Sequence, residues 1–343
     1  MSEPLRIGIA GAGKIVASEH APRFRAIPGV ELVAVANQTP ESSRRAAERL
    51  GIGRTYGSWS ELIEDDEVDA VLVGTWPYLH APIAIAALYA GKHVLTEARM
   101  ATDGEAAAAM ADAALDNPSL VAMVVPASFS LWADRAIGRI LGDGTIGRLL
   151  AVRVTWDGGS GTDPGEWWRW QRRYSGNNVM ALGILYEAMA RWLGHAEWVT
   201  AEAQVVTPRK PAPGGVLVPT DVPDHLVAVA GFAGDVTATI EMSTVTLRGT
   251  GIHASFVGTD GTLEADFGTA TLGVRRHGAA RARPVTIQED ERDEWRAERD
   301  FVAAVRGEKA VELTDFETGR RYMEFVDAVH ASNRDGQRIA LGG

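Results

Sequence analysis

The chain reads LRIGIAGAGKIV over residues 5–16. Residues 5–10, which are apolar except for Arg6, are typical of a buried strand, and a helical pattern follows. Between them, Gly11 permits a tight turn, and Gly13 lets a ligand approach the backbone closely. The first N–H groups of a helix bind phosphate because they lack partners within the helix. The segment therefore predicts a dinucleotide-binding turn, although Val16 stands where glycine or alanine is usual and implies looser packing of helix on strand.

Around this turn, short apolar runs alternate with helical patterns through the first third of the chain. Such alternation predicts successive βαβ units on a parallel sheet. Strands are expected at residues 5–10, 31–36, 70–74, 93–96 and 120–125, and helices at residues 14–26, 40–50, 58–65, 81–90 and 104–115. We therefore predict an α/β Rossmann domain over residues 1–125.

After residue 126 the pattern changes to strands with period-two alternation. Strands are expected at residues 149–156, 198–206, 225–232, 235–243, 253–258 and 261–265, and helices at residues 133–141, 180–193, 294–305 and 316–334. The prediction is an α+β domain over residues 126–343 with an open, mostly antiparallel sheet. Residues 208–215, rich in proline and glycine, are expected to form a loop, and residues 289–299 a solvated helix start.

Composition excludes several classes of function. The net charge of −11 argues against a nucleic-acid binder or a protein of anionic membrane surfaces. The absence of cysteine excludes disulfides, zinc–thiolate sites and a cysteine nucleophile. No histidine or carboxylate cluster has metal-ligand spacing, so no metal is expected. The start of the chain carries no signal-peptide pattern, and no apolar stretch approaches membrane length, so we expect a cytoplasmic protein.

The cofactor's ribose should be read at the end of the second predicted strand. The sequence there is Asn37-Gln38-Thr39, with no acidic residue to bind a 2′-hydroxyl group. Without that negative charge, a 2′-phosphate is not repelled. Both NAD and NADP therefore remain open as the cofactor.

Several further motifs occur in a fixed order along the chain. These are TWPYLH at residues 75–80, GKHVLTE at 91–97, GTIG at 144–147, WR at 168–169, GTDGTL at 258–263 and FVAAVRG at 301–307. Together with residues 8–15 and 31–36, they resemble the Gfo/Idh/MocA family of NAD(P)-dependent sugar and polyol oxidoreductases. The resemblance implies that an open-sheet domain covers the nicotinamide and that homo-oligomers form through this sheet.

The resemblance also implies roles for individual residues. Those matching cofactor-binding positions are Gly11, Gly13, Lys14 and Ile15 at the diphosphate, Asn37 at the ribose, Thr75, Trp76 and His80 along the cofactor, and Glu97 and Ala98 near the nicotinamide ribose. His20, in the first helix, is expected to be a packing residue.

The residues that implement catalysis in the family are replaced here. Family members use a lysine after the glutamate of Glu-Lys-Pro, and an aspartate and a histidine of a later motif. The corresponding residues in this chain are Ala98, Ala181 and Leu185. None of these side chains can transfer a proton, so the family's usual mechanism is not expected.

Two explanations remain open. In the first, the site is rebuilt with other catalytic groups, for which Tyr186, Arg99 and Tyr174 are the candidates. In the second, the protein binds NAD(P) without turnover. A variant of the first keeps the cofactor bound and cleaves a glycoside with no net redox change.

The substrate is expected to meet the segment WWRWQRRY at residues 167–174. Arg169 and Arg173 suit anionic groups, and Trp168 suits a sugar face or an aromatic ring. Asn178 and His225 are further candidates for substrate contacts. The alternative is a surface loop with packed tryptophans. The prediction is an oxidoreductase acting on a small polyhydroxylated or cyclic substrate, neutral or anionic, with a non-standard acid or base.

Overall fold

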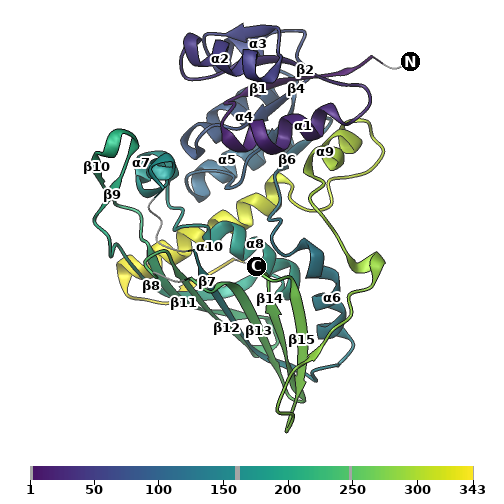
Figure 1. Ribbon diagram of the computed structural model, residues 1–343, viewed down its shortest axis with the longest axis vertical. Coiled ribbons are helices and arrows are strands. Elements are labelled where there is room, and N and C mark those ends of the chain that lie inside the picture. Colours follow the sequence, from purple (N-terminus) through teal and green to yellow (C-terminus); the bar gives the residue numbers. More distant parts are fainter. Residues whose placement is uncertain (1–2, 159–162, 247–248, 343) are drawn as a thin grey trace. The chain divides into compact units, whose positions relative to one another are not determined.

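The computed structural model describes residues 3–158, 163–246 and 249–342, which form two compact units (Figure 1). The first unit comprises Met1–Pro126 and Arg296–Met323. The second comprises Ala127–Trp295 and Glu324–Gly343. Residues 296–323, which the sequence places in the second domain, thus return to the first, because their apolar side chains pack there.

A six-stranded parallel sheet with the order β3-β2-β1-β4-β5-β6 forms the centre of the first unit. Its strands are β1 Leu5–Ala10, β2 Val30–Ala36, β3 Arg54–Tyr56, β4 Ala70–Val73, β5 His93–Thr96 and β6 Ala122–Val124. β1 lies between β2 and β4, so the strand order reverses beside it. Ligands of such sheets bind outside the carboxyl ends of the strands at this point of reversal.

The helices of the first unit follow the predicted βαβ order. They are α1 Ala21–Arg25, α2 Pro40–Leu50, α3 Trp59–Glu64, α4 His80–Tyr89 and α5 Gly104–Asp116. The returning residues add α9 Ala297–Val305, which lies outside this order. Every residue of β4 is buried, as expected for a sheet covered on both faces. The helix predicted from residue 14 contains a π turn at Val16–His20 before it continues as α1.

The second unit contains a nine-stranded mixed sheet within the described residues, with the order β16-β15-β14-β13-β7-β12-β11-β8-β17. Its strands are β7 Leu149–Asp157, β8 Ala196–Gln204, β11 His225–Phe232, β12 Val236–Ser243, β13 Gly251–Gly258, β14 Gly261–Asp266, β15 Thr271–Arg276, β16 Arg283–Pro284 and β17 Ile339–Ala340. Neighbours are antiparallel except β7 and β12, which are parallel. This confirms the predicted fold class.

Helices pack against this second sheet. They are α6 Leu131–Gly142, α8 Leu182–Leu193 and the later part of α10 Phe316–Asp335. Trp192 of α8 contacts Phe256 edge-on and stacks on Phe267, each with ring centroids 5.5 Å apart. The aromatic contacts bury the face of α8 that meets the strands.

Shorter elements complete the second unit. They are the 3₁₀ segment Pro164–Trp170, α7 Arg172–Ser175, and the strand pair β9 Arg209–Pro211 and β10 Leu217–Pro219. The loop predicted at residues 208–215 is therefore partly wrong, because β9 lies within it. None of the helices formed by the described residues is both long and apolar enough to cross a membrane.

Candidate cofactor-binding site

Gly11 fixes the turn after β1. Its φ of +90° lies in the left-handed region that favours glycine, and a Cβ would lie 2.7 Å from the backbone nitrogen of Thr75. Val16 is buried beside Gly74, where a Cβ would lie 2.3 Å from a Val16 methyl carbon. The larger side chain at the third small position is thus accommodated by a glycine on the neighbouring strand end. The looser packing of helix on strand that the sequence suggests remains a prediction.

Gly13 is constrained in a different way. A Cβ at this position would meet the carbonyl oxygen of Gly74 at 3.8 Å, which is ordinary van der Waals contact. Gly13 also lines a cavity of about 510 Å³ at the carboxyl ends of the strands. The protein itself would accept alanine here, whereas a phosphate at the helix N-terminus needs the space that a Cβ would fill. The cradle therefore fits a dinucleotide diphosphate.

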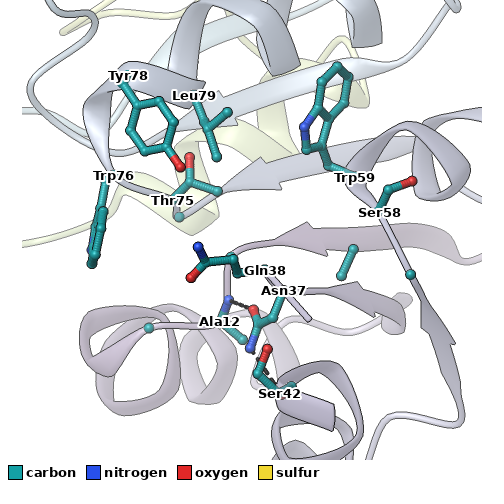
Figure 2. A pocket seen from close by; sticks show the side chains of 15 residues that line it. Ala12, Asn37, Gln38, Ser42, Ser58, Trp59, Thr75, Trp76, Tyr78 and Leu79 are labelled. Carbon is teal, nitrogen blue, oxygen red and sulfur yellow. Dashed lines mark hydrogen bonds between the residues drawn. The ribbon is translucent and has the colours of Figure 1, made fainter. Parts of the chain in front are cut away.

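Side chains clamp the residue between these two glycines. The N–H of Ala12 donates to Oδ1 of Asn37 at 2.7 Å, and its carbonyl oxygen accepts from Nη2 of Arg49 at 2.8 Å. The amide nitrogen of Asn37 donates to the carbonyl oxygen of Ser42 at 3.1 Å, as Figure 2 shows. Asn37, expected to read the ribose, therefore also holds the glycine turn.

The cavity is lined by small, hydroxyl, amide and aromatic side chains. Its lining residues are Gly11, Ala12, Gly13, Ala36, Asn37, Gln38, Ser42, Gly57, Ser58, Trp59, Gly74, Thr75, Trp76, Tyr78 and Leu79. In Figure 2, Trp59 and Ser58 lie on one side of it and Trp76 and Tyr78 on the other. None of the residues in this lining is charged. The volume lies within the range of small-molecule and cofactor sites.

His80 connects two backbone segments next to the cavity. Its Nε2 lies 3.0 Å from the carbonyl oxygen of Thr75, and its Nδ1 lies 2.9 Å from that of Arg99. Complete burial lowers the pKa of His80, and its contacts with backbone carbonyl groups oppose this shift only in part. The ring is therefore neutral near neutral pH and ties the segment after β4 to the segment after β5. It lies outside the cavity lining but positions Thr75, which belongs to it.

Glu97 follows β5, and its N–H donates to the carbonyl oxygen of Val73 at 2.9 Å, so it lies at the same edge of the sheet as Gly74. Its carboxylate lies 2.9 Å from Nε2 of His20, and Nδ1 of His20 lies 2.6 Å from a carboxylate oxygen of Glu298. His20 and Glu298 are buried, whereas the Glu97 side chain is 18% exposed.

The two carboxylates determine the charge of His20. Burial, the largest effect, lowers its pKa, but hydrogen bonds and charge from Glu298 and Glu97 outweigh burial and raise the pKa to about 9. The ring is therefore a cation at neutral pH and donates from both nitrogens. The sequence identifies His20 only as a packing residue.

The sequence does not identify Glu298, nor does it identify Ser58 and Trp59, which line the cavity. The prediction that residues 289–299 form a solvated helix start is wrong here, because Glu298 is only 1% exposed and follows the first residue of α9. It lies 278 positions from His20 along the chain, so no local pattern could link the two.

The other predicted residues of the first unit lie around the cavity without lining it. Lys14 and Ile15 are exposed at the start of the first helix. Ala98 is half-buried and Arg99 is buried, and the carbonyl oxygen of Arg99 contacts His80. The proposed roles of these residues remain predictions.

In the second unit, the predicted substrate segment forms pairs of cations and aromatic rings. The guanidinium of Arg169 lies 4.7 Å from the centroid of the Trp168 ring, and that of Arg173 lies 4.5 Å from the Tyr174 ring. Trp167 contacts Tyr174 edge-on at 5.4 Å. Arg173 is exposed and the other four side chains are half-buried. The segment can therefore present flat and cationic groups to a ligand.

A buried ion pair anchors this segment. Nζ of Lys210 lies 3.1 Å from the carboxylate of Asp224 and 3.4 Å from the centroid of the Trp170 ring. Burial lowers the pKa of Lys210, while Asp224 opposes that shift. The neighbouring Gln171 donates from its side-chain amide to the carbonyl oxygen of Pro219. The tryptophan-rich segment is therefore held firmly against β9 and β10.

Asn178 and His225 belong to the second unit as well. Asn178 is 1% exposed, and its amide nitrogen donates to the carbonyl oxygen of Ser175. His225 is half-buried and is the first residue of β11. Asn178 thus stabilises the turn before α8, and a substrate contact for either residue remains a prediction.

Tyr186 lies in the core of the second unit. It is 2% exposed, and its ring stacks on Phe325 with centroids 3.8 Å apart. Its hydroxyl oxygen accepts a hydrogen bond from the N–H of Ala196 at 2.9 Å. Leu185, at the position of the family's histidine, is also buried. These surroundings are those of a packing residue and disagree with the catalytic role that the sequence suggests for Tyr186.

Comparisons with known proteins agree with this architecture. Residues 5–124 match the Gfo/Idh/MocA model described as an oxidoreductase family with an NAD-binding Rossmann fold, and residues 135–264 match the Gfo/Idh/MocA C-terminal domain. The N-terminal domain is thus an NAD-binding domain.

Curated relatives include two dehydrogenases. Levoglucosan dehydrogenase of Pseudarthrobacter phenanthrenivorans is 30% identical over 260 residues, which cover 69% of this chain and 65% of that protein. This match spans less than two thirds of the relative's own length. Myo-inositol 2-dehydrogenase of Thermotoga maritima is 27% identical over 267 residues, covering 76% of this chain and 75% of that protein.

Among solved structures, levoglucosan dehydrogenase in complex with NADH and L-sorbose has a TM-score of 0.84. It is 24% identical in sequence, and the superposition covers 98% of this chain and 99% of that one. At this identity the likeness establishes the fold.

Proposed function

Because the chain belongs to the Gfo/Idh/MocA family of oxidoreductases, we propose that it is an NAD-dependent dehydrogenase that oxidises a hydroxyl group of a sugar-type or cyclic polyol substrate. The cradle at Gly13 is the observation that carries this proposal. It leaves room for a diphosphate that the fold itself does not require. When bound, NAD supplies the ring that accepts hydride.

The relatives support the substrate class. Levoglucosan dehydrogenase and myo-inositol 2-dehydrogenase are both named for compact, hydroxylated ring compounds. In this chain the half-buried Trp168 ring offers a flat apolar surface of the kind that packs on the face of a sugar ring, and Arg169 beside it offers hydrogen-bond donors. We assign these two residues to the substrate.

We further propose that NAD is preferred over NADP. A 2′-phosphate needs a cation or several free donors, and the cavity lining contains no lysine or arginine. The nearby Arg45 pairs with Glu41, and Arg49 binds the carbonyl oxygen of Ala12. We expect NADP to bind roughly tenfold or more weakly than NAD, as measured by fluorescence titration of both cofactors. Equal affinities would contradict this preference.

We assign the proton transfer to Tyr174. The side chains of Ala98, Ala181 and Leu185 have no proton to exchange, and the hydroxyl of Tyr186 lies in the core. Tyr174 is half-buried and has an ionisable hydroxyl group. Replacing it with phenylalanine should lower kcat by about 100-fold and leave the affinity for NAD unchanged. Wild-type turnover in Tyr174→Phe would exclude this role.

The function is tested by incubating the protein with NAD and a panel of anhydrosugars, hexoses, sugar acids and inositols. A dehydrogenase accumulates reduced nicotinamide over many turnovers, visible in its absorbance band. Product without net reduction of NAD would instead indicate a redox-neutral cleavage in which the cofactor is recycled. The variant Gly13→Ala is the control, because it should abolish either reaction.

A second candidate function is NAD binding without catalysis. The apolar residues at all three positions where the family carries proton-transfer groups favour it. Tight NAD binding with no turnover on the whole panel would support it over a dehydrogenase.

A further inference from the structure

Three charged side chains are linked in a row within the first unit. The last of them lies at the carboxyl ends of the strands, where the cofactor is expected to bind. Glu298 from α9 binds His20, and His20 binds Glu97 after β5. Burying ionised groups is unfavourable, and well-packed apolar residues of similar volume would stabilise the fold as well. The retained charges therefore indicate a task beyond packing.

The position of Glu97 indicates what that task is. In doubly wound sheets the diphosphate lies at the turn after the first strand, where the strand order reverses. β4 and β5 lie on the other side of β1 from β2 and β3, so we expect the turn after β5 to face the nicotinamide half of a bound dinucleotide. Glu97 directly follows β5 and is the one partly exposed member of the three. A carboxylate at that place can accept hydrogen bonds from ribose hydroxyl groups.

The π turn adds a reason for the position of His20. It spans Val16–His20, and the N–H of Ala21 closes it on the carbonyl oxygen of Val16. Such turns insert an extra residue into a helix, which redirects side chains, and they are frequent at functional sites. Here His20, the last residue of the turn, reaches Glu97 and Glu298 at once.

We propose that His20 and Glu298 are positioning residues that fix the Glu97 carboxylate so that it binds the ribose next to the nicotinamide. Glu298 orients His20 through one ring nitrogen, and His20 holds one oxygen of Glu97 through the other. This inference rests on the proposed function, because it requires that NAD occupies the edge of the sheet.

The experiment compares NAD with ADP, which contains only the adenosine and diphosphate half. The variant Glu298→Gln keeps the shape of a buried residue outside the cavity lining but removes its charge. We expect NAD to bind about tenfold more weakly to this variant, which is the effect of a weakened charge-assisted hydrogen bond, and ADP to bind as it does to the wild type. Glu97→Gln should give the same pattern.

The double variant separates positioning from general damage. If Glu298 acts through Glu97, combining Glu97→Gln and Glu298→Gln should weaken NAD binding no more than Glu97→Gln alone. Asp69→Asn is the matched control, because Asp69 forms an ion pair with Arg6 at the amino ends of the strands, the end of the sheet opposite the expected cofactor. It should lower thermal stability without changing the affinity for NAD.

Nuclear magnetic resonance of the wild-type protein gives a test that needs no variant. NAD should shift the imidazole signals of His20, and ADP should leave them in place. Unchanged NAD affinity in Glu298→Gln, equal losses for NAD and ADP, or His20 signals that ignore NAD would each overturn the proposal. If the wild type binds neither NAD nor ADP, the proposed function fails instead.

Discussion

Gly11 and Gly13 belong to one turn but require glycine for different reasons. Gly11 has a positive φ and touches the neighbouring turn, so a larger residue there disturbs the fold. At Gly13 the protein leaves room for a Cβ, and the expected ligand does not. We predict that Gly13→Ala weakens NAD binding by about 100-fold or more while the free energy of unfolding changes by less than about 0.5 kcal/mol. Calorimetric titration and chemical denaturation measure the two quantities.

The control for this variant is Gly138→Ala. Gly138 is an exposed glycine inside α6, and a Cβ there would meet no atom within 4 Å. Alanine should stabilise the protein by about 0.5–1 kcal/mol and leave NAD binding unchanged. If Gly13→Ala lost stability as well as affinity, the constraint at Gly13 would come from the fold.

Tyr186 allows a test of the role that the sequence suggests for it. In Tyr186→Phe the buried N–H of Ala196 loses the acceptor that it has at 2.9 Å. The unfolding free energy should therefore fall by about 1–3 kcal/mol, with kcat unchanged. Urea denaturation and steady-state kinetics on the same preparation decide the question. A large loss of kcat without loss of stability would restore Tyr186 as a catalytic residue.

At the residue scale, the sequence identifies features whose cause is local. The glycine turn, Thr75 and Trp76 follow strand ends that apolar runs mark clearly, and all of them line the cavity. The burial of Tyr186 depends on Ala196 and Phe325, which come from other segments of the second unit. A helical pattern predicts on which face of the helix a residue lies, but it does not predict which residues pack against that face.

Helices and strands likewise divide into those that local sequence marks and those that depend on distant parts of the chain. The predicted bounds of β1, α2, β5 and β11 agree with the structure because caps, turns and apolar runs mark both ends. For α2, Thr39 caps the start and Gly51 ends the helix with φ of +59°. By contrast, β3 has three residues, and β15 lies towards the edge of its sheet and ends in arginines. A strand at the edge of a sheet does not need a clear alternation of apolar and polar residues. Its sequence therefore does not mark it as a strand, and its pairing with a neighbouring strand does.

The contact between α9 and the first helix makes stability depend on pH. Glu97 and Glu298 are the charged groups that contact His20, and they raise its pKa from an ordinary 6.5 to about 9. A raised folded-state pKa means that this stabilisation is complete below the unfolded value and is lost as pH rises through about 9. We predict that the free energy of unfolding falls by on the order of 3 kcal/mol between neutral pH and pH values above the pKa of His20.

Thermal denaturation across that pH range measures this loss. In Glu298→Gln one carboxylate charge is gone, so the pKa of folded His20 is raised less, and the fall in stability should be smaller and end at a lower pH than in the wild type. Identical pH profiles for the two proteins would show that His20 is not the group responsible.

At the scale of the whole molecule, the first unit is assembled from two distant stretches of chain. Thr314 accepts from the N–H of Val124 at 2.9 Å, so the returning segment extends the edge at β6. Phe301 packs edge-on against Phe24, with ring centroids 6.4 Å apart, and Glu298 binds His20. The family models match residues 5–124 and 135–264 of this chain, so neither match includes the returning segment.

We therefore predict that residues 1–126 alone do not form a stable domain. Loss of the Phe301 ring would cost about 3–5 kcal/mol by comparison with core truncations, and loss of a partner from a buried ion pair costs a similar amount. Together these losses match most of the 5–15 kcal/mol that stabilises an ordinary domain. Joining residues 296–323 to residue 126 through a flexible glycine–serine linker should restore cooperative thermal unfolding and NAD binding. Cooperative unfolding of the shorter fragment, at the same temperature as the linked one, would show that the returning segment is dispensable.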